Sequence, residues 1–250
     1  MPSYRVVLVE PAFEESIGFT ARAMKNFGLE ALHLVNPVTT LSKEGRMRGA
    51  HAQDILDSIM VHDSLLDALK GLNLVVGTTA QKAHSDSNLI RKPMSPRELA
   101  GVVPRNGTVG IVLGREGTGL NNHELSLCDA LVTIPAVEEY PTLNISHAAA
   151  IIFYELSNPV VATVDEELGN ENVKETILSY LAESLAVTGL EDYKIGLTTR
   201  ALKNVMGRSA MRRREGSLLA GAFRQISQVL SNQRSPEPLR EASVTLQLED

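Results

Sequence analysis

EEYPTLNISHAAAIIFYEL at residues 138–156, together with GREGTGL at residues 114–120, decides the fold of this chain. The two stretches follow short apolar runs, ALVTIP from Ala130 and TVGIVLG from Thr108, and such runs are typical of buried parallel strands. Each stretch also leads into a helical pattern. Because ligands of α/β sheets bind beyond the carboxyl ends of the strands, we expect a ligand site where these two loops meet.

The longer stretch carries residue types that suit the start of a helix beside a ligand. Pro135, Pro141, Thr142 and Asn144 lie within ten residues of one another. Asn144 or Thr142 would cap the next helix, which leaves backbone N–H groups facing a ligand. On this pattern alone, a well-capped core helix without a ligand is an equal alternative.

Residues before this point alternate between strand and helix patterns. Residues 4–9 (YRVVLV) and 31–35 predict strands, and residues 16–27 between them have apolar side chains at helical spacing, with Gly28 as the stop. Such a βαβ unit requires parallel strands. Further strands are predicted at 73–77, 108–114 and 130–135, a short one at 58–62, and helices at 49–58, 64–69 and 95–103. We therefore predict an α/β fold with at least five or six mainly parallel strands and helices on both faces.

The character of the chain changes after residue 156. Residues 159–172 are acidic, polar and turn-rich, which indicates a linker after a first domain at 1–158. Residues 173–231 contain three helix patterns without strand signals and predict a small all-helical domain. Residues 232–250 have two prolines and few apolar residues, which predicts a disordered tail.

Composition limits the class of protein. The chain has 250 residues, of which 43% are hydrophobic, enough for one or two packed domains. It shows neither an apolar run of the roughly 18 residues that a membrane span needs nor a signal-peptide pattern, so we expect it in the cytoplasm without a membrane partner. The single cysteine, Cys128, has no Cys/His cluster around it, so we predict a buried apolar residue and no metal site.

The charge pattern bears on nucleic-acid binding. A formal net charge of −6 argues against sequence-independent binding of nucleic acid, although it leaves room for a local basic patch. One dense basic cluster lies in the helical region, where it indicates either a solvated helix face or contact with phosphates. The polar loop at 81–96 adds further cations and has the length of a functional loop. The candidate RNA-binding residues are Arg91 and Lys92 in that loop, and Lys203, Arg208, Arg212, Arg213 and Arg214 in the cluster.

Three segments together carry a family resemblance. Residues 7–29 (VLVEPAFEESIGFTARAMKNFGL), 114–120 (GREGTGL) and 140–146 (YPTLNIS) resemble, in order and spacing, the three motifs of the SPOUT-class RNA 2′-O-methyltransferases, in particular the TrmJ-type tRNA methyltransferases. The likeness extends from about residue 4 to about residue 156. It implies that the sheet ends in a C-terminal trefoil knot, and that the protein is a homodimer acting on tRNA.

The resemblance also implies a cofactor, S-adenosylmethionine, held by the knot loops. Small residues and free backbone groups can approach an adenine edge and a ribose closely, while apolar residues flank the base. Carried over by position, the cofactor-binding residues are Thr78, Thr79, Ala80, Gly114, Ile134, Pro141, Thr142 and Leu143.

Four residues are implied in catalysis: Arg22, Ser16, Glu116 and Asn144. Arg22 stays protonated, so we expect it to bind a phosphate or stabilise the developing alkoxide, and in the family it is thought to act from the other subunit. Glu116 would orient a neighbouring group, or else pair with Arg115. Asn144 would hold the ribose or cap its helix. Ser16 stands where the family pattern N-x-G-x-x-x-R has Asn, so its role is open.

The sequence thus predicts an S-adenosylmethionine-dependent tRNA 2′-O-methyltransferase, with nucleotide 32 of the anticodon loop, cytidine or also uridine, as the family's precedent. Two alternatives remain at this stage. One is a SPOUT enzyme that modifies another tRNA position or ribosomal RNA. The other is a non-catalytic RNA-binding protein of the same fold, which Ser16 favours and the presence of Arg22, Glu116 and Asn144 disfavours.

Overall fold

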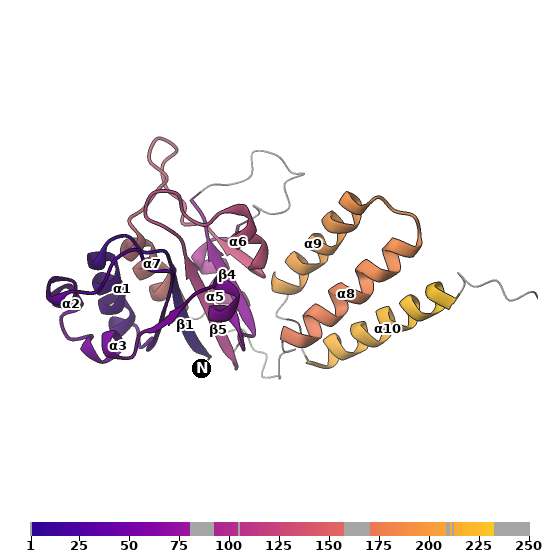
Figure 1. The fold of residues 1–250 in the computed structure, drawn as a ribbon, viewed down its shortest axis with the longest axis horizontal. Helices are drawn as coiled ribbons and strands as arrows, with labels where there is room; N and C mark the ends of the chain where they lie inside the picture. The colour runs from indigo at the N-terminus through magenta and orange to yellow at the C-terminus, as the bar shows by residue number, and fades with distance from the viewer. Residues whose placement is uncertain are drawn as a thin grey trace, which may run out of the picture.

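The computed structural model describes residues 2–80, 93–104, 106–157, 171–208, 211 and 213–232. A sheet with covering helices forms one part of the molecule, and three long helices form a second part beside it (Figure 1). In chain order the elements are β1 (Ser3–Val9), α1 (Glu14–Asn26), β2 (Ala31–Val35), α2 (Lys43–Gly49), α3 (Gln53–Asp57), β3 (Met60–His62), α4 (Leu65–Leu69), β4 (Leu74–Thr78), α5 (Pro96–Val102), β5 (Thr108–Leu113), α6 (Asn122–Leu127), β6 (Ala130–Val132), α7 (Ile145–Ser157), α8 (Glu171–Val187), α9 (Asp192–Arg208) and α10 (Arg213–Asn232).

The sheet has six strands in the order β3-β2-β1-β5-β4-β6, and each neighbouring pair is parallel. β1 lies at the centre, where Arg5 is in register with Ala31 of β2 and with Gly110 of β5. The predicted mainly parallel sheet is confirmed. The trefoil knot, which concerns threading of the chain rather than strand pairing, stays a prediction.

Helices cover both faces of this sheet, as predicted. Because side chains alternate along a strand, Val6 and Leu8 of β1 pack in one core and Val7 and Val9 in the other. The first core contains α1, α3, α5 and α7, and the second contains α4 and α6. Cys128 is fully buried in the second core, as expected for a small apolar residue.

Residues 49–58 do not form the single helix that the pattern predicts. Helix α2 begins before this range, at Lys43, and ends at Gly49, because Ala50 has a φ of +47°; within the rest of the range only α3 is helical. Ser42 caps α2 by accepting a hydrogen bond from the Glu44 backbone N–H.

The helices α8, α9 and α10 have a small core of their own, built around Ile177, Met206 and Met211. They fall within the predicted helical domain at 173–231, although α8 begins two residues earlier and α10 ends one residue later. The predicted linker lies mostly, and the predicted tail almost wholly, outside the described residues, so the domain boundaries stay a proposal.

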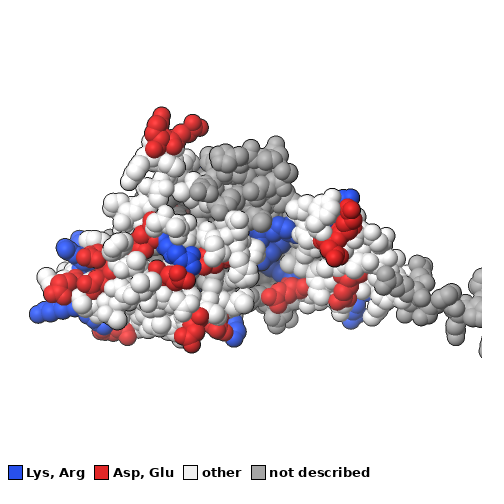
Figure 2. Space-filling model, turned by 45° about the horizontal axis from the view of Figure 1, so that its top comes forward, with Lys and Arg blue, Asp and Glu red and all other residues white. Residues whose placement is uncertain are grey.

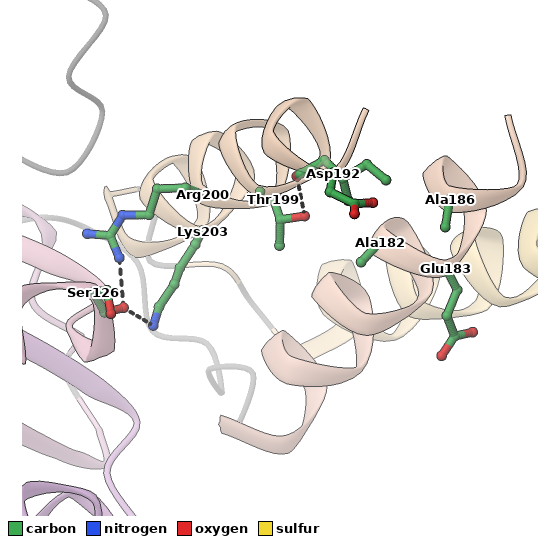
Figure 3. Close-up of a pocket in the computed structure, with 10 residues that line it drawn as sticks. Ser126, Ala182, Glu183, Ala186, Asp192, Thr199, Arg200 and Lys203 are labelled. Atoms are coloured by element: carbon green, nitrogen blue, oxygen red, sulfur yellow. Dashed lines mark hydrogen bonds between the residues drawn. The ribbon is translucent and has the colours of Figure 1, made fainter. Parts of the chain in front are cut away.

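The helical part docks on α6 through positive side chains (Figure 3). Arg200 Nη1 donates to the carbonyl oxygens of Ser126 at 2.8 Å and Cys128 at 3.3 Å, and Lys203 Nζ donates to those of Ser126 and Leu127, both at 3.1 Å. The last carbonyls of a helix have no partner within it and carry partial negative charge, so cations stabilise them. A groove of about 710 Å³ between α6, α8 and α9 lies beside this junction.

Candidate active site

A cavity of about 230 Å³ lies at the carboxyl ends of β4, β5 and β6. Its walls come from three parts of the chain: the end of β4, the loop at 114–120, and the segment from β6 to α7. Ile145 and Ile152 of α7 close the apolar side. The structure brings together here every predicted cofactor-binding residue: Thr78, Thr79, Ala80, Gly114, Ile134, Pro141, Thr142 and Leu143.

The loop at 114–120 folds tightly back on itself. Arg115 N–H donates to the Gly119 carbonyl at 3.3 Å, and Gly119 N–H donates to the Arg115 carbonyl at 3.0 Å. A Cβ added at Gly114 would lie 2.3 Å from the carbonyl carbon of Gly119. Only glycine therefore fits at position 114, which explains its place in the motif.

Thr78 contributes to this site differently from Thr79 and Ala80. Its hydroxyl donates to the Val112 carbonyl at 3.1 Å, so it fastens the end of β4 to β5. The Thr78 hydroxyl is therefore already engaged in a hydrogen bond within the protein. Thr78 thus shapes the wall of the cavity rather than donating this hydrogen to a ligand.

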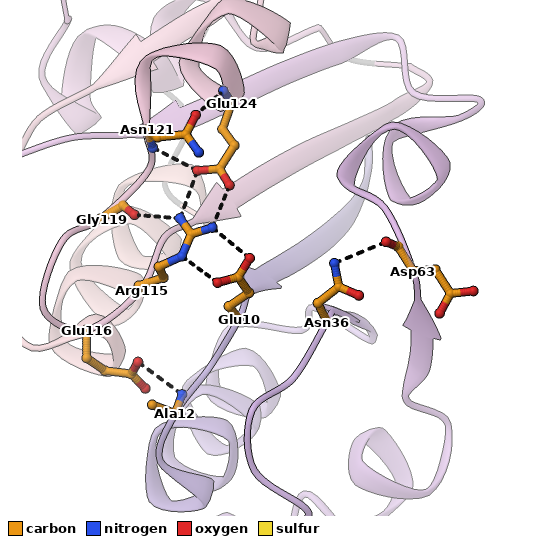
Figure 4. Close-up of polar contacts among 9 residues, drawn as sticks. All are labelled: Glu10, Ala12, Asn36, Asp63, Arg115, Glu116, Gly119, Asn121 and Glu124. Atoms are coloured by element: carbon orange, nitrogen blue, oxygen red, sulfur yellow. Dashed lines mark hydrogen bonds and ion pairs between the residues drawn. The ribbon is translucent and has the colours of Figure 1, made fainter.

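Arg115 forms the most connected polar group of the site (Figure 4). Its guanidinium lies between the carboxylates of Glu10, at the end of β1, and Glu124, on α6, and contacts both oxygens of each. These ion pairs raise the pKa of Arg115, and they lower the pKa of Glu10 below its usual value. The sequence suggested Arg115 only as a partner for Glu116. In the sequence, Glu10 and Arg115 each follow a predicted strand, but nothing there pairs them, and Glu124 on α6 has no such signal.

Glu116 faces the opposite way and caps α1. Its carboxylate accepts hydrogen bonds from the backbone N–H groups of Ala12 at 3.2 Å and Phe13 at 3.4 Å. Phe13, at the N-cap, has no side chain that can accept a hydrogen bond from the helix. A carboxylate from elsewhere therefore supplies the negative charge that a helix N-terminus favours. The neighbouring group that Glu116 orients is α1, and a direct part in catalysis stays a prediction.

Helix α1 carries the other two candidate catalytic residues. Ser16 is buried, and Arg22 is exposed to solvent less than two turns further along the helix. Neither lines the cavity described above. Thr20, between them, is fully buried, and its hydroxyl has no hydrogen-bond partner among the described residues. The structure thus places Arg22 where it is accessible to another molecule, and its catalytic role stays a prediction.

Asn144 caps α7, which is one of the two roles that its sequence context allows. Its Oδ1 accepts from the backbone N–H of Ser146 at 2.9 Å and from the Ser146 hydroxyl at 2.7 Å. The side chain therefore holds the helix start in place beside the cavity-lining residues 141–143. A contact between Asn144 and the ribose stays a prediction.

The candidate RNA-binding residues differ in exposure and in their contacts. Lys203 Nζ is half-buried at the junction with α6 and donates to two carbonyl oxygens there, so its contact with RNA stays a prediction. Burial also lowers the pKa of Lys203. Arg214 is exposed at the start of α10. The remaining residues, or their side chains, lie outside the described part of the chain: Arg91, Lys92, Arg208, Arg212 and Arg213.

Comparison with known proteins decides the family. A family model described as the SpoU rRNA Methylase family matches residues 3–154, which is more than half of the 250 residues. The chain belongs to the SpoU rRNA methylase family. This confirms the predicted resemblance to SPOUT-class RNA 2′-O-methyltransferases of the TrmJ type, and with it the reaction class and S-adenosylmethionine as the cofactor.

Individual relatives of this SpoU-family chain extend over nearly its whole length. It is 33% identical over 225 residues to the tRNA (cytidine-2′-O-)-methyltransferase TrmJ of Methanocaldococcus jannaschii, covering 88% of this chain and 97% of that protein. It is 33% identical over 256 residues to the tRNA (cytidine/uridine/adenosine-2′-O-)-methyltransferase TrmJ of Pseudomonas aeruginosa, covering 93% and 98%. The crystal structure of TrmJ from Z. mobilis superposes with a TM-score of 0.65 at 26% identity, covering 94% of this chain and 100% of that one.

The cavity of this SpoU-family protein fits S-adenosylmethionine. The backbone at Gly114 leaves no room for a side chain, so the cradle wall there is bare main chain. Ile134, Leu143 and Ile152 offer apolar surface for the adenine ring. Among the described residues no group of three His, Cys, Asp or Glu side chains is placed to hold a metal ion, and no helix is long and apolar enough to cross a membrane.

Proposed function

We propose that this protein methylates the 2′-hydroxyl of a ribose in tRNA. The observation that carries the proposal is the convergence of eight residues from three separate segments on one cavity at the sheet edge. The relatives named TrmJ, which match over 88% and 93% of this chain, support tRNA as the substrate. The chemistry moves a methyl group from a sulfonium to the ribose oxygen, and the 2′-hydroxyl loses its proton. S-Adenosylmethionine supplies the methyl group.

The residues of the chain have separate tasks in this reaction. The cavity walls would bind and orient the cofactor, and Ile145 and Ile152 would exclude water from the apolar side of the cavity. Arg22 would hold the phosphate next to the target ribose or stabilise the developing alkoxide, since a guanidinium does not accept a proton at neutral pH. Glu116 fixes the start of the helix that carries Arg22.

We assign the target to nucleotide 32 in the anticodon loop, with cytidine or also uridine as the base. The names of the two relatives at 33% identity support cytidine as the shared base and differ in the bases they add. The test uses two synthetic tRNAs that differ only at nucleotide 32, one with ribose and one with 2′-deoxyribose. Methyl transfer to the ribose form alone is expected, whereas equal transfer to both would move the target to another nucleotide.

The active form in this proposal is a homodimer in the cytoplasm, where tRNA is modified. Apolar side chains exposed on α1 and α7, which pack against each other, support a shared interface: Phe19, Ile151 and Tyr154 are 40%, 37% and 56% exposed. Arg22, accessible on the same α1, would then reach the partner's cavity. Light scattering should give about twice the chain mass of 27.1 kDa, and a monomer mass at working concentration would contradict the dimer.

The basic cluster at the start of α10 would grip tRNA phosphates. Figure 2 shows Lys and Arg side chains gathered where the helical part meets the sheet part, with mixed charges elsewhere on that face. Those at the junction include cations that already hold carbonyl oxygens, so the grip falls to Arg208, Arg212, Arg213 and Arg214. Replacing Arg212, Arg213 and Arg214 with Gln should flatten the dependence of log affinity on log salt, because each lost phosphate contact removes about one counterion. An unchanged slope would show that the cluster is only a solvated helix face.

A further inference from the structure

Arg115 ties three segments of the active site together. Its Nε and Nη2 donate to Glu10 at 2.7 and 2.8 Å, and its Nη1 and Nη2 donate to Glu124 at 3.0 and 2.8 Å. A fifth contact joins Nη1 to the Gly119 carbonyl at 3.2 Å. The planar fork of an arginine is thereby used on both sides, which lysine cannot reproduce.

The partners of Arg115 come from three different segments of the chain. Glu10 lies at the end of β1, four residues before α1 begins, and has a φ of +47°. Glu124 lies in the first turn of α6 and completes a capping box with Asn121. Gly119 lies at the far end of the loop that holds Gly114. Arg115 therefore fixes the cofactor loop to the β1–α1 turn on one side and to α6 on the other.

Glu116 reinforces the same link from the next position in the chain. Its bonds to the N–H groups of Ala12 and Phe13 hold the start of α1, while Arg115 holds Glu10 just before it. The two backbone hydrogen bonds between Arg115 and Gly119 close the loop on itself. The Arg115 side chain therefore contacts both this closed loop and the segment just before α1.

We propose that Arg115 is a positioning residue for methyl transfer: it fixes α1, with Ser16 and Arg22, against the cofactor loop of its own chain and so sets the place from which Arg22 would reach the partner's cavity. The inference rests on the proposed function. Methyl transfer requires the attacking oxygen and the methyl group to be aligned, and a displacement of about 1 Å can cost about 10²-fold in rate. The link acts through geometry, because the guanidinium itself is occupied by Glu10, Glu124 and Gly119.

The test compares Arg115→Lys with Arg46→Lys, a control at another arginine that pairs with a carboxylate, Asp57. Arg115→Lys keeps the charge and loses the two-sided fork, so kcat should fall roughly 10- to 100-fold while the affinity for S-adenosylmethionine, measured by calorimetry, changes much less. Arg46→Lys should leave both unchanged. A loss of affinity as large as the loss of rate would make Arg115 a cofactor-binding residue and overturn the inference, as would an unchanged kcat.

Two further readouts separate the inference from the proposed function. Hydrogen exchange of the Ala12 and Phe13 amides in the free protein should become faster in Arg115→Lys and not in Arg46→Lys, whatever the substrate is; unchanged exchange overturns the link. In a double-mutant cycle, Glu10→Gln added to Arg115→Lys should reduce kcat little beyond the single change, because both break one cluster, and additive losses overturn it. Absence of tRNA methylation by the wild-type protein would instead refute the proposed function.

Discussion

Glu116 and Asn144 serve helix N-termini in this structure, although the family motif implies catalysis for both. Each accepts hydrogen bonds from backbone N–H groups, Glu116 at α1 and Asn144 at α7. Helix α7 borders the candidate cofactor cavity, and α1 carries the candidate catalytic residues Ser16 and Arg22. These two motif side chains thus hold the starts of α1 and α7 in place.

Arg22 is the residue whose removal should affect chemistry without affecting the fold. Arg22→Ala should reduce methyl transfer by roughly 10²-fold or more, because a charged group positioned at the transition state is lost. The melting temperature and the affinity for S-adenosylmethionine should remain near those of the wild type, since Arg22 is exposed and does not line the cavity. Arg97→Ala, at an exposed arginine of α5, is the control, and equal turnover in both variants would make Arg22 an ordinary surface residue.

Gly114 and Gly101 offer a matched pair, one in the cavity wall and one exposed on α5. A Cβ at Gly114 would lie 2.3 Å from the Gly119 backbone, whereas a Cβ at Gly101 would meet nothing within 4 Å. Gly114→Ala should therefore distort the loop and weaken S-adenosylmethionine binding by at least roughly tenfold, the equivalent of about 1.4 kcal/mol. Gly101→Ala should bind nearly as the wild type does. Calorimetry on both variants measures this, and normal binding by Gly114→Ala would show that the loop does not form the cofactor cradle.

The meeting of the candidate cofactor-binding residues at one cavity could be predicted, because they lie at the ends of strands or in the segments that follow them, and parallel strands end at one edge of a sheet. The partners of Arg115 could not, because Glu10 lies 105 positions away and meets it only through the register of β1 with β5. The contacts of Lys203 with α6 could not be predicted either. A cation on a helix face has the same sequence signature whether it meets a phosphate or the carbonyl end of another helix.

At the scale of elements, α6 joins the cofactor loop to the helical part. Its first turn holds Arg115 through Glu124, and its last carbonyls accept hydrogen bonds from Arg200 and Lys203 of α9. These contacts fix both ends of α6, a helix of six residues. Lys174 of α8 adds a second link between the two parts, because its Nζ donates to the Asn73 carbonyl, just before β4, at 2.8 Å. Together these contacts favour one arrangement of the two parts.

Gly207 tests whether this docking matters for stability. A Cβ there would lie 2.3 Å from the Asp129 carbonyl oxygen, while a Cβ at Gly196 on the same helix would meet nothing within 4 Å. Gly207→Ala should lower the free energy of unfolding by about 1–3 kcal/mol through overpacking at the junction. Gly196→Ala should instead raise it by up to about 1 kcal/mol, because alanine favours a helix. Denaturant unfolding measures the free energy of unfolding of both variants, and small-angle scattering detects any separation of the two parts. Equal free energies of unfolding in the two variants would show that the junction is not tightly packed.

In the whole molecule, the sheet part contains the candidate cofactor cavity, and the helical part extends from one side of the sheet (Figure 1). The strand and helix alternation sufficed to predict the parallel sheet, because buried parallel strands are nearly continuous apolar runs. The arrangement of the helical part depends on polar contacts to carbonyl oxygens, which have no sequence signature. With tRNA as the substrate, the sheet part would carry out methyl transfer and the helical part would bind tRNA phosphates.

Mass spectrometry of nucleosides from tRNA incubated with the wild-type protein and S-adenosylmethionine tests the proposed reaction most directly. Gly101→Ala and Gly114→Ala, assayed in parallel, connect the product to the cavity. We predict a 2′-O-methylated nucleoside, 2′-O-methylcytidine first, from the wild type and Gly101→Ala, and little or none from Gly114→Ala. A nucleoside methylated on its base, or unmodified tRNA in the presence of bound cofactor, would contradict this function.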